Sequence, residues 1–329
     1  MTESRALYQS NINAELPALE TDVFRGYAAE DIDRIKRIMP EDLQPDSAFY
    51  TDSMGVKISP EYCPWIAASV GSVDNTVPIP GDGYIGEAIE YAAFAIATEL
   101  SKNRSTFNVV ELGAGWGPWV SLAAVNAPRL GFEKVNLVAF EADSTRFDSL
   151  RRHLSINNVI HPDSGNEGED EHYGWRLLNS AAHWANTKLY WPASSNLLDA
   201  GMAPTSDPNA SVDYRGKSIE HIEINAIDVI EAIDHLDVVD FMHIDIQGGE
   251  AELIPNILDA LSKKVSVLMI GTHSRKIEGD FIASLPQKGW KLFRERPCQF
   301  YSMANAPTLE GLTYIDGAQM WVNMGLDRN

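Results

Sequence analysis

The sequence predicts an α/β protein with a doubly wound, mostly parallel sheet. Two stretches carry this prediction, because each runs from a short apolar segment through glycines into a helical pattern: residues 107–119 and residues 238–250. Short apolar runs that end in tight turns are typical of buried parallel strands. Helical patterns separate the remaining apolar runs, which is the order of elements that crossover helices between parallel strands require.

The composition is that of an ordinary globular chain with an acidic surface. Of the 329 residues, 44% are hydrophobic and 22% are charged, and 47 Asp and Glu outnumber 26 Lys and Arg to give a net charge of -21. Such a surface repels phosphate backbones and anionic membranes, so we expect no nucleic-acid partner and no membrane partner. No run approaches the roughly 20 apolar residues that span a bilayer, and residues 1–20 lack the apolar core of a signal peptide. We expect a soluble, cytoplasmic protein.

The two cysteines support the same compartment. Cys63 and Cys298 lie far apart in the chain and have no metal-ligand spacing. A disulfide framework is therefore not expected, and both thiols are interpreted as buried small hydrophobic groups in a reducing environment.

Residues 1–80 are expected to form a mainly helical cap, a substrate-side extension that packs on a larger domain spanning residues 81–329. Short helical patterns such as residues 31–39 alternate with turn-rich pieces, and the segment is too short to bury a large core alone. Three aromatic side chains either line a substrate mouth or pack against the neighbouring core: Tyr50, Tyr62 and Trp65.

An amphipathic pattern over residues 84–100 predicts a helix that leads into the first strand. This strand ends in a carboxylate and a turn with glycines at alternate positions, which are Glu111, Gly113, Gly115 and Gly117. Glycines let the backbone pass close under a ligand and adopt positive φ. A dinucleotide fingerprint would have its third glycine at the position of Pro118, so a pyrophosphate site is the weaker interpretation. The spacing resembles the first motif of class I methyltransferases, in which the turn lies under the methionine part of S-adenosylmethionine. The alternative is a glycine turn that only packs a helix on a strand.

A second signal lies at the end of the next strand, residues 135–140, which closes on Glu141. In a doubly wound sheet this strand end lies beside the glycine turn, where the Glu141 carboxylate can accept hydrogen bonds from both ribose hydroxyls. Asp143 is expected to cap the following helix. The third strand, residues 175–178, ends near Ser180 and Ala181, which either hold the adenine or only pack a turn.

The fourth strand, within residues 238–250, places His243, Asp245 and Gln247 on one face. Polar residues at alternate positions of a central strand cost free energy unless they have partners, so this pattern indicates a site. The prediction rests mainly on Asp245, which lies nearest the strand end, whereas His243 is interpreted as a buried histidine with a partner. Glu250 is expected to favour the positive start of its helix.

The remaining strands are expected at residues 265–270, 290–293 and 319–323, which makes seven in total, with the last two antiparallel to each other. Residues 192–217 have no regular pattern and are interpreted as a substrate-facing lid. Residues 161–171 are expected to form a solvated loop.

Four segments together resemble the FkbM family of S-adenosylmethionine-dependent methyltransferases: residues 111–115, 140–141, 240–248 and 271–273. The resemblance spans roughly residues 81–325. It implies a Rossmann-like class I methyltransferase fold and O-methylation of a small molecule, sugar or other natural product. Many family members carry Lys in place of His243 and an acid in place of Gly271, so roles at these two positions do not transfer.

Asp245 and His273 are predicted to flank the methyl-transfer centre, because both close neighbouring strands at their carboxyl ends. His273 has the unperturbed pKa of a base near neutrality. One carboxylate and one imidazole make a poor Mg²⁺ site, so we expect metal-independent base catalysis. The alternative is a divalent metal held by Asp245 and His273, with Glu250 or the substrate completing the site. Less favoured interpretations are an NAD-dependent dehydrogenase and a non-catalytic cofactor-binding protein.

Overall fold

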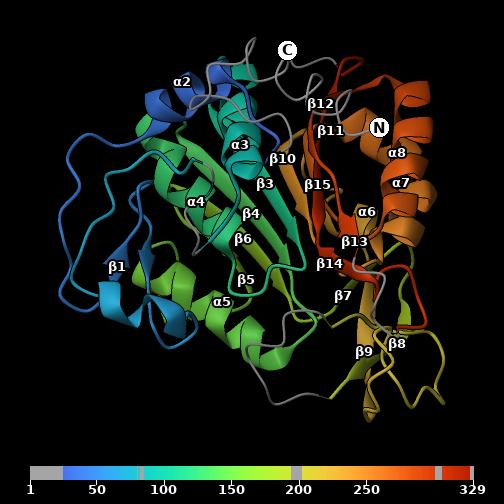
Figure 1. The fold of residues 1–329 in the computed structure, drawn as a ribbon. Helices are drawn as coiled ribbons and strands as arrows, with labels where there is room; N and C mark the ends of the chain where they lie inside the picture. Colours follow the sequence, from blue (N-terminus) through green and yellow to red (C-terminus); the bar gives the residue numbers. More distant parts are fainter. Residues whose placement is uncertain (1–24, 80, 82–84, 194–201, 301–305, 327–329) are drawn as a thin grey trace, which may run out of the picture.

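The computed structural model describes residues 25–79, 81, 85–193, 202–300 and 306–326, and its centre is an eight-stranded sheet (Figure 1). The strand order is β12-β15-β11-β10-β3-β4-β6-β5. β11, β10, β3, β4 and β6 run parallel, β15 is antiparallel to both β11 and β12, and β5 is antiparallel to β6. The bounds are β3 (Thr106–Leu112), β4 (Lys134–Phe140), β5 (Glu167–Glu169), β6 (Tyr173–Leu178), β10 (Val239–Ile244), β11 (Val265–Thr272), β12 (Trp290–Arg296) and β15 (Gly317–Asn323).

Helices cover both faces of this sheet, as Figure 1 shows. One hydrophobic cluster joins α3, α4 and α5 to side chains such as Phe107 and Phe241, and a second joins α6 and α7 to side chains such as Leu112 and Ile244. Neighbouring residues of a strand point to opposite faces, so fully buried strands supply apolar side chains to both clusters. The bounds are α3 (Ala88–Leu100), α4 (Pro118–Asn126), η3 (Pro128–Leu130), α5 (Ser144–Ile156), α6 (Val229–Ala232), α7 (Glu250–Lys264), α8 (Arg275–Ser284) and η4 (Leu285–Lys288).

The strand order confirms the predicted doubly wound, mostly parallel Rossmann-like α/β fold, with one correction to the strand count. The antiparallel pairing of the last two strands is also confirmed. The sheet has eight strands instead of seven, because Glu167–Glu169 pairs with the edge strand β6 inside the stretch expected to be a solvated loop. These three residues are largely exposed and include no large apolar side chain. The sequence therefore lacks the hydrophobic pattern from which a strand could be predicted here.

The N-terminal segment packs on the α3–α5 face of the sheet. It contains α2 (Ala29–Ile38), β1 (Tyr50–Thr51), β2 (Lys57–Ile58) and η2 (Pro64–Ser69), so one α-helix and one 3-10 helix accompany two very short strands. Ile35, Met54 and Ile66 are fully buried in the same hydrophobic cluster as Phe94 and Val109. The described part of this segment therefore shares its core with the sheet, while residues 1–24 lie outside the described residues.

A small second sheet stands beside the carboxyl end of β6. It has the order β7-β9-β8, formed by β7 (Ala181–His183), β8 (Thr187–Pro192) and β9 (His221–Asp228), and lies at the lower right of Figure 1. The segment predicted as a lid continues from β8; residues 194–201 lie outside the described residues, and Thr205 returns to pair with Tyr190. A further hairpin joins β13 (Gln299–Phe300) to β14 (Thr313–Ile315). Among the described residues, no helix is long and apolar enough to cross a membrane.

Candidate functional site

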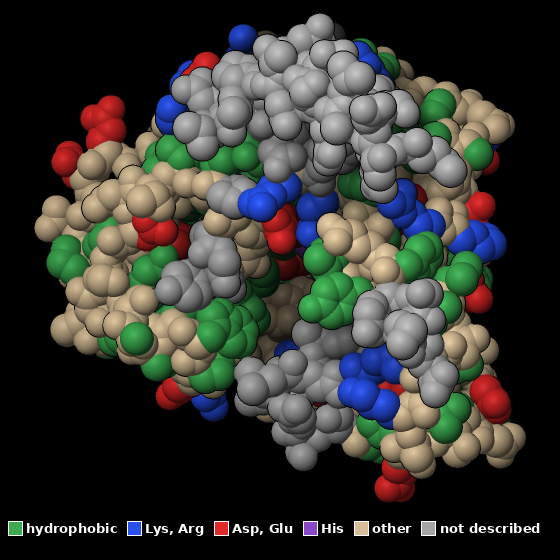
Figure 2. Space-filling model, in the orientation of Figure 1, with side chains coloured by type: hydrophobic (Ala, Val, Ile, Leu, Met, Phe, Trp, Pro, Cys, Tyr) green, Lys and Arg blue, Asp and Glu red, His purple; other side chains and the backbone are tan. Residues whose placement is uncertain are grey.

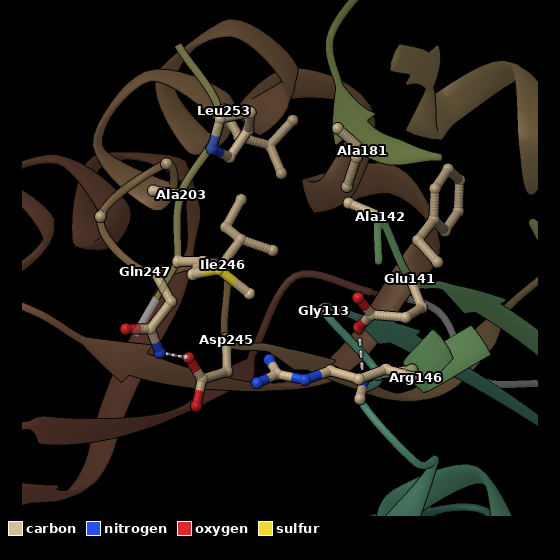
Figure 3. Close-up of a pocket in the computed structure, with 18 of the residues that line it drawn as sticks. Gly113, Glu141, Ala142, Arg146, Ala181, Ala203, Asp245, Ile246, Gln247 and Leu253 are labelled. Carbon is tan, nitrogen blue, oxygen red and sulfur yellow. Dashed lines mark hydrogen bonds between the residues drawn. The ribbon is translucent and has the colours of Figure 1, made fainter. Parts of the chain in front are cut away.

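A cavity of about 1040 Å³ opens at the carboxyl ends of β3, β4 and β10. Ligands of open α/β sheets bind at this edge, where the loops that follow the strands can be shaped without disturbing the sheet. Figure 2 shows a hollow near the centre of the molecule with apolar and acidic side chains around it, and Figure 3 shows the cavity wall. The predicted residues Glu111, Gly113, Gly115, Glu141, Ser180, Ala181 and Asp245 all line it.

The glycine turn between β3 and α4 forms the floor of the cavity. Gly113, Gly115 and Gly117 have φ of 78°, 57° and 76°, which places all three in the left-handed region, as the sequence predicted. A Cβ at Gly113 would lie 1.9 Å from the carbonyl oxygen of Asp245, so the ends of β3 and β10 approach as closely as they do only because Gly113 has no side chain. Gly117 is the N-cap of α4 and does not line the cavity.

Glu111 holds this turn against the helix that follows it. Its side chain is buried, and its two carboxylate oxygens accept hydrogen bonds from the backbone N–H groups of Trp119 and Val120 at 3.3 and 2.9 Å. Burial raises the pKa of Glu111 to about 8, although these N–H groups and His243 act in the opposite direction. The residue therefore fixes the start of α4 beneath the cavity.

Glu141 lies where the sequence placed the ribose ligand, directly beside the glycine turn. One carboxylate oxygen accepts a hydrogen bond from Gly115 N at 2.6 Å and the other from Asp143 N at 2.7 Å. Burial raises the pKa of Glu141 to about 7, opposed by these two N–H groups and by Arg146. Asp143 caps α5, as predicted, by accepting hydrogen bonds from Thr145 N and Arg146 N. The carboxylate of Glu141 is thus oriented before any ligand binds.

The wall next to Glu141 is built from small side chains. Ala142 and Ala181 lie beside Glu141 in Figure 3, and Ser180 is 1% exposed. The Ser180 hydroxyl is buried and has no hydrogen-bond partner among the described residues. An unpaired buried hydroxyl is costly, so it indicates a place for a polar atom of a ligand. The glycine floor, the oriented carboxylate and this hydroxyl together offer polar contacts to a ligand at the ends of β3 and β4.

A row of three charged side chains closes the end of β10 and β11. His273 Nε2 lies 3.3 Å from Asp245 Oδ1, and His273 Nδ1 lies 3.3 Å from Glu250 Oε1. Burial opposes ionisation of Asp245 and of His273, but the ion pairs prevail: the pKa of Asp245 is lowered to about 2 and that of His273 is raised well above its usual value. The Asp245 side chain is 42% exposed on the cavity side, whereas His273 is 3% exposed and lies behind it. Asp245 is therefore a fixed carboxylate held by an imidazolium.

The same three side chains are the described group that could hold a metal ion, with ligand atoms within 4.8 Å of one another. Glu250 is already engaged, because its two oxygens accept hydrogen bonds from Ile246 N and Gly248 N at 2.7 and 2.8 Å. Both ring nitrogens of His273 face a carboxylate. The two carboxylates share this one imidazole, and Asp316 Oδ2 lies 4.0 Å from its Nε2. Because the imidazole lies between the carboxylates and the Glu250 oxygens accept backbone hydrogen bonds, the group offers few free ligand atoms to a cation.

The structure brings together a pair that sequence reasoning did not identify, Glu90 and His243. His243 Nε2 lies 2.8 Å from Glu90 Oε1, and the His243 ring stacks on Trp119 with centroids 5.2 Å apart. Both residues line the cavity. Glu90 Oε2 accepts a hydrogen bond from Glu87 N at the start of α3. The Glu87-x-x-Glu90 spacing at a helix start was a signal for this cap, but not for the contact with His243.

Two of the three aromatic side chains of the N-terminal segment line the cavity. Trp65 is 47% exposed at its edge, and Tyr62 stacks on Trp116 with ring centroids 5.7 Å apart. Tyr50 is buried away from the cavity and is a packing residue.

The described part of the predicted lid also lines the cavity, through residues 202–206 and Tyr214. The Tyr214 hydroxyl donates a hydrogen bond to Gln247 Oε1 at 3.3 Å, and Gln247 Nε2 donates one to Asp245 Oδ1 at 3.0 Å. Figure 3 shows Gln247 and Asp245 side by side with this second bond drawn. The lid segment is thereby linked to the fixed carboxylate.

No family model matches the chain. The chain is similar to a putative methyltransferase from Jannaschia sp., with 27% identity over 277 residues that make up 82% of this chain and 91% of the relative. Among solved structures it is similar to a precorrin-6y C5,15-methyltransferase from Geobacter metallireducens, with 10% identity, coverage of 72% of this chain and 87% of that chain, and a TM-score of 0.36. A putative RNA methyltransferase from Pyrococcus horikoshii has 11% identity, coverage of 71% and 84%, and a TM-score of 0.33. The sequence relative supports a methyltransferase and leaves the acceptor open.

Proposed function

We propose that this protein is an S-adenosylmethionine-dependent O-methyltransferase that acts on a hydroxyl of a small molecule, sugar or natural product. The observation that carries the proposal is the Glu141 carboxylate, oriented by Gly115 N and Asp143 N at the edge of the glycine turn. The Jannaschia relative supports methyl transfer, and the resemblance to the FkbM family supports oxygen as the acceptor atom. Cys63 and Cys298 are buried thiols that form no disulfide, which is in keeping with a cytoplasmic enzyme.

In this proposal the residues of the cavity divide into two groups. Glu141 binds the ribose hydroxyls, Ser180 and Ala181 lie against the purine, and the turn at Gly113 and Gly115 passes under the methionine part. The cofactor supplies a methyl group on a positively charged sulfonium. Asp245 supplies a permanent negative charge at the end of β10, which favours binding of a cation.

Asp245 and His273 are not well suited to act as the base that removes the proton of the acceptor. A carboxyl whose pKa is about 2 is a weak base, and an imidazolium behind it has no free lone pair. We therefore propose that His273 positions Asp245 and that Asp245 orients the reacting groups electrostatically. Metal-independent transfer stays part of the proposal, because His273 lies between the two carboxylates and both Glu250 oxygens already accept backbone hydrogen bonds.

A nicotinamide dinucleotide is disfavoured by the charge of the cavity. Its pyrophosphate would face two acidic side chains that line the cavity, Glu90 and Asp245. Like charges in a confined site repel strongly, whereas a sulfonium is attracted by them. The same argument disfavours the phosphate backbone of RNA.

Calorimetry with S-adenosylmethionine, its demethylated product and NAD tests the cofactor. We expect the first two to bind and NAD not to bind. Glu141→Ala removes two ribose hydrogen bonds of about 0.5–1.5 kcal/mol each, so binding of both ligands should weaken roughly tenfold or more. The control is Glu167→Ala, because Glu167 is an exposed glutamate on β5. Binding of NAD, or equal affinity in the Glu141 variant, contradicts the proposal.

The acceptor class is tested by transfer of a radiolabelled methyl group. The protein is incubated with labelled cofactor and either the small-molecule filtrate of a cell extract or total RNA. Label is expected in the filtrate only. Label in RNA would overturn the small-molecule proposal and leave the cofactor assignment intact.

A further inference from the structure

The cavity has a second polar centre besides the ribose ligand, the Glu90–His243 pair. It lies between α3 and β10, which are separated by about half of the chain. The Glu90 carboxylate is fixed at both oxygens, with His243 Nε2 at 2.8 Å from Oε1 and Glu87 N at 2.7 Å from Oε2. Its side chain is 16% exposed, so part of it faces the cavity, whereas the His243 side chain is 5% exposed.

The other acidic side chains that line the cavity near the glycine floor already have hydrogen-bond or ion-pair partners. Glu111 is buried with its oxygens on N–H groups of α4. Glu141 holds the glycine turn and faces the purine side. Asp245 is an ion-pair partner of His273 with a pKa of about 2. Asp245 has an exposed side as well, but its pKa of about 2 makes it a weak proton acceptor. Glu90 is the remaining carboxylate of this part of the cavity, with a partly exposed side chain and His243 as its neighbour.

That neighbour is an imidazole with one polar contact. His243 Nδ1 is buried and has no hydrogen-bond partner among the described residues, so Glu90 is the partner of the ring. Burial lowers the pKa of His243, but Glu90, Glu111 and Asp245 together raise it above its usual value. The contact with His243 keeps the Glu90 carboxylate in one orientation.

Trp119 packs against the pair and is itself buried. Trp119 stacks on His243, and a Cβ at Gly86 would lie 2.7 Å from the Trp119 ring and 2.9 Å from Glu90 Oε2, so Trp119 and Glu90 lie close to each other. Trp116 lines the same cavity. A flat or ring-shaped body can pack against the partly exposed rings of Trp65 and Trp116, which line the same cavity, while a hydroxyl at its edge meets a carboxylate.

We propose that Glu90 is the catalytic residue that accepts the proton of the acceptor hydroxyl, that His243 is its positioning residue, and that the acceptor is a neutral, ring-bearing alcohol. This rests on the proposed methyltransferase function. The acceptor O–H bond breaks and its proton goes to the Glu90 carboxylate. An oxygen electron pair forms the new C–O bond to the methyl carbon, and the electrons of the broken C–S bond stay on sulfur. Glu90 then returns the proton to solvent through the cavity.

The test uses the full chain saturated with the demethylated cofactor product and NMR of labelled histidine rings, with His243→Gln to assign the signal. Phenol and methyl glucoside are the neutral probes, and phenyl phosphate is the charged one. We expect at least one neutral probe to shift the His243 signal and phenyl phosphate to leave it unchanged. In Glu90→Gln the probe shift is lost, and the titration of His243 moves to lower pH because the ring has lost its anionic partner.

The control is His161→Gln, since His161 is an exposed histidine outside the cavity, and it leaves these shifts unchanged. The proposal is overturned if neither neutral probe shifts the His243 signal, if the phosphate probe does so equally, or if Glu90→Gln leaves the titration in place. A protein that does not bind the cofactor product at all contradicts the proposed function instead, so the two failures are distinguishable.

Discussion

Glu141 illustrates how a single carboxyl couples ligand binding to pH. Its pKa is raised to about 7 by burial, and we propose that it binds the ribose as an anion. Below about pH 7 the free protein carries a proton that it must lose on binding, so affinity falls as the pH falls, by up to about tenfold per unit. We expect the affinity for the cofactor product, measured by calorimetry between about pH 8 and about pH 6, to decrease in the wild type.

The matched variant is Glu141→Gln, which has no proton to lose. Its affinity is expected to be weaker than that of the wild type at high pH and to change little with pH. A pH dependence that persists in this variant would show that another group is responsible.

Several site residues could be predicted from the sequence because their signals are local. The turn glycines and Glu141 all follow strands within a few residues, and Asp143 precedes a helix by one. Glu90 and His243 are 153 residues apart, and only the register of α3 against β10 brings them together. The pairing of His273 with Glu250 is also not a local signal, because it depends on how α7 packs against β11. It further requires the Glu250 side chain to turn back toward Ile246, which precedes it in the chain.

At the scale of one element, the N-cap of α5 is hydrogen-bonded to Glu141, the proposed ribose ligand. Asp143 caps this helix by accepting hydrogen bonds from two backbone N–H groups, and its own N–H donates to Glu141. Asp143→Ala is expected to destabilise the protein by about 1 kcal/mol, as is usual for loss of an N-cap. Urea unfolding measures this cost.

The control for the cap is Asp148→Ala, an exposed aspartate inside the same helix. It should change the free energy of unfolding by less than about 0.5 kcal/mol. Equal costs for the two variants would mean that the cap contributes little.

The elements themselves were predicted where hydrophobic periodicity was strong. The parallel strands and the helices α3, α5 and α7 carry apolar side chains on their buried faces. In these elements the hydrophobic pattern of the sequence matches the packing in the structure. The prediction was wrong at β5, whose exposed residues pair only through their backbone. A short, exposed strand of this kind forms because the edge strand of a sheet lies next to it. A local sequence pattern gives no information on that neighbour.

At the scale of the whole molecule, an ion network joins the two ends of the described chain. Arg294 on β12 contacts Asp31 and Glu30 of α2 at 2.5 Å, and Asp31 is fully buried. Arg294→Met leaves Asp31 with Arg34 as its remaining cationic partner. We expect a loss of roughly 1–3 kcal/mol in the free energy of unfolding, because a buried charge loses a hydrogen-bonded partner.

The comparison variant is Arg37→Met, since Arg37 forms an exposed ion pair with Glu99 and should cost at most about 1 kcal/mol. Unfolding of both variants is expected to remain a single transition, because the N-terminal segment and the sheet share one core. Two separate transitions would contradict a shared core.

The shared core also bears on protein engineering. Residues 25–79 supply Tyr62 and Trp65 to the cavity wall, while Ile35, Met54 and Ile66 pack among side chains of the sheet and its helices. A chimera that exchanges this segment with that of a relative changes the cavity wall and the interior packing in one step, because closely packed interiors tolerate few mismatches in shape. The segment is not a transplantable module, and new acceptor preferences are more safely sought by substituting the cavity-facing rings one at a time.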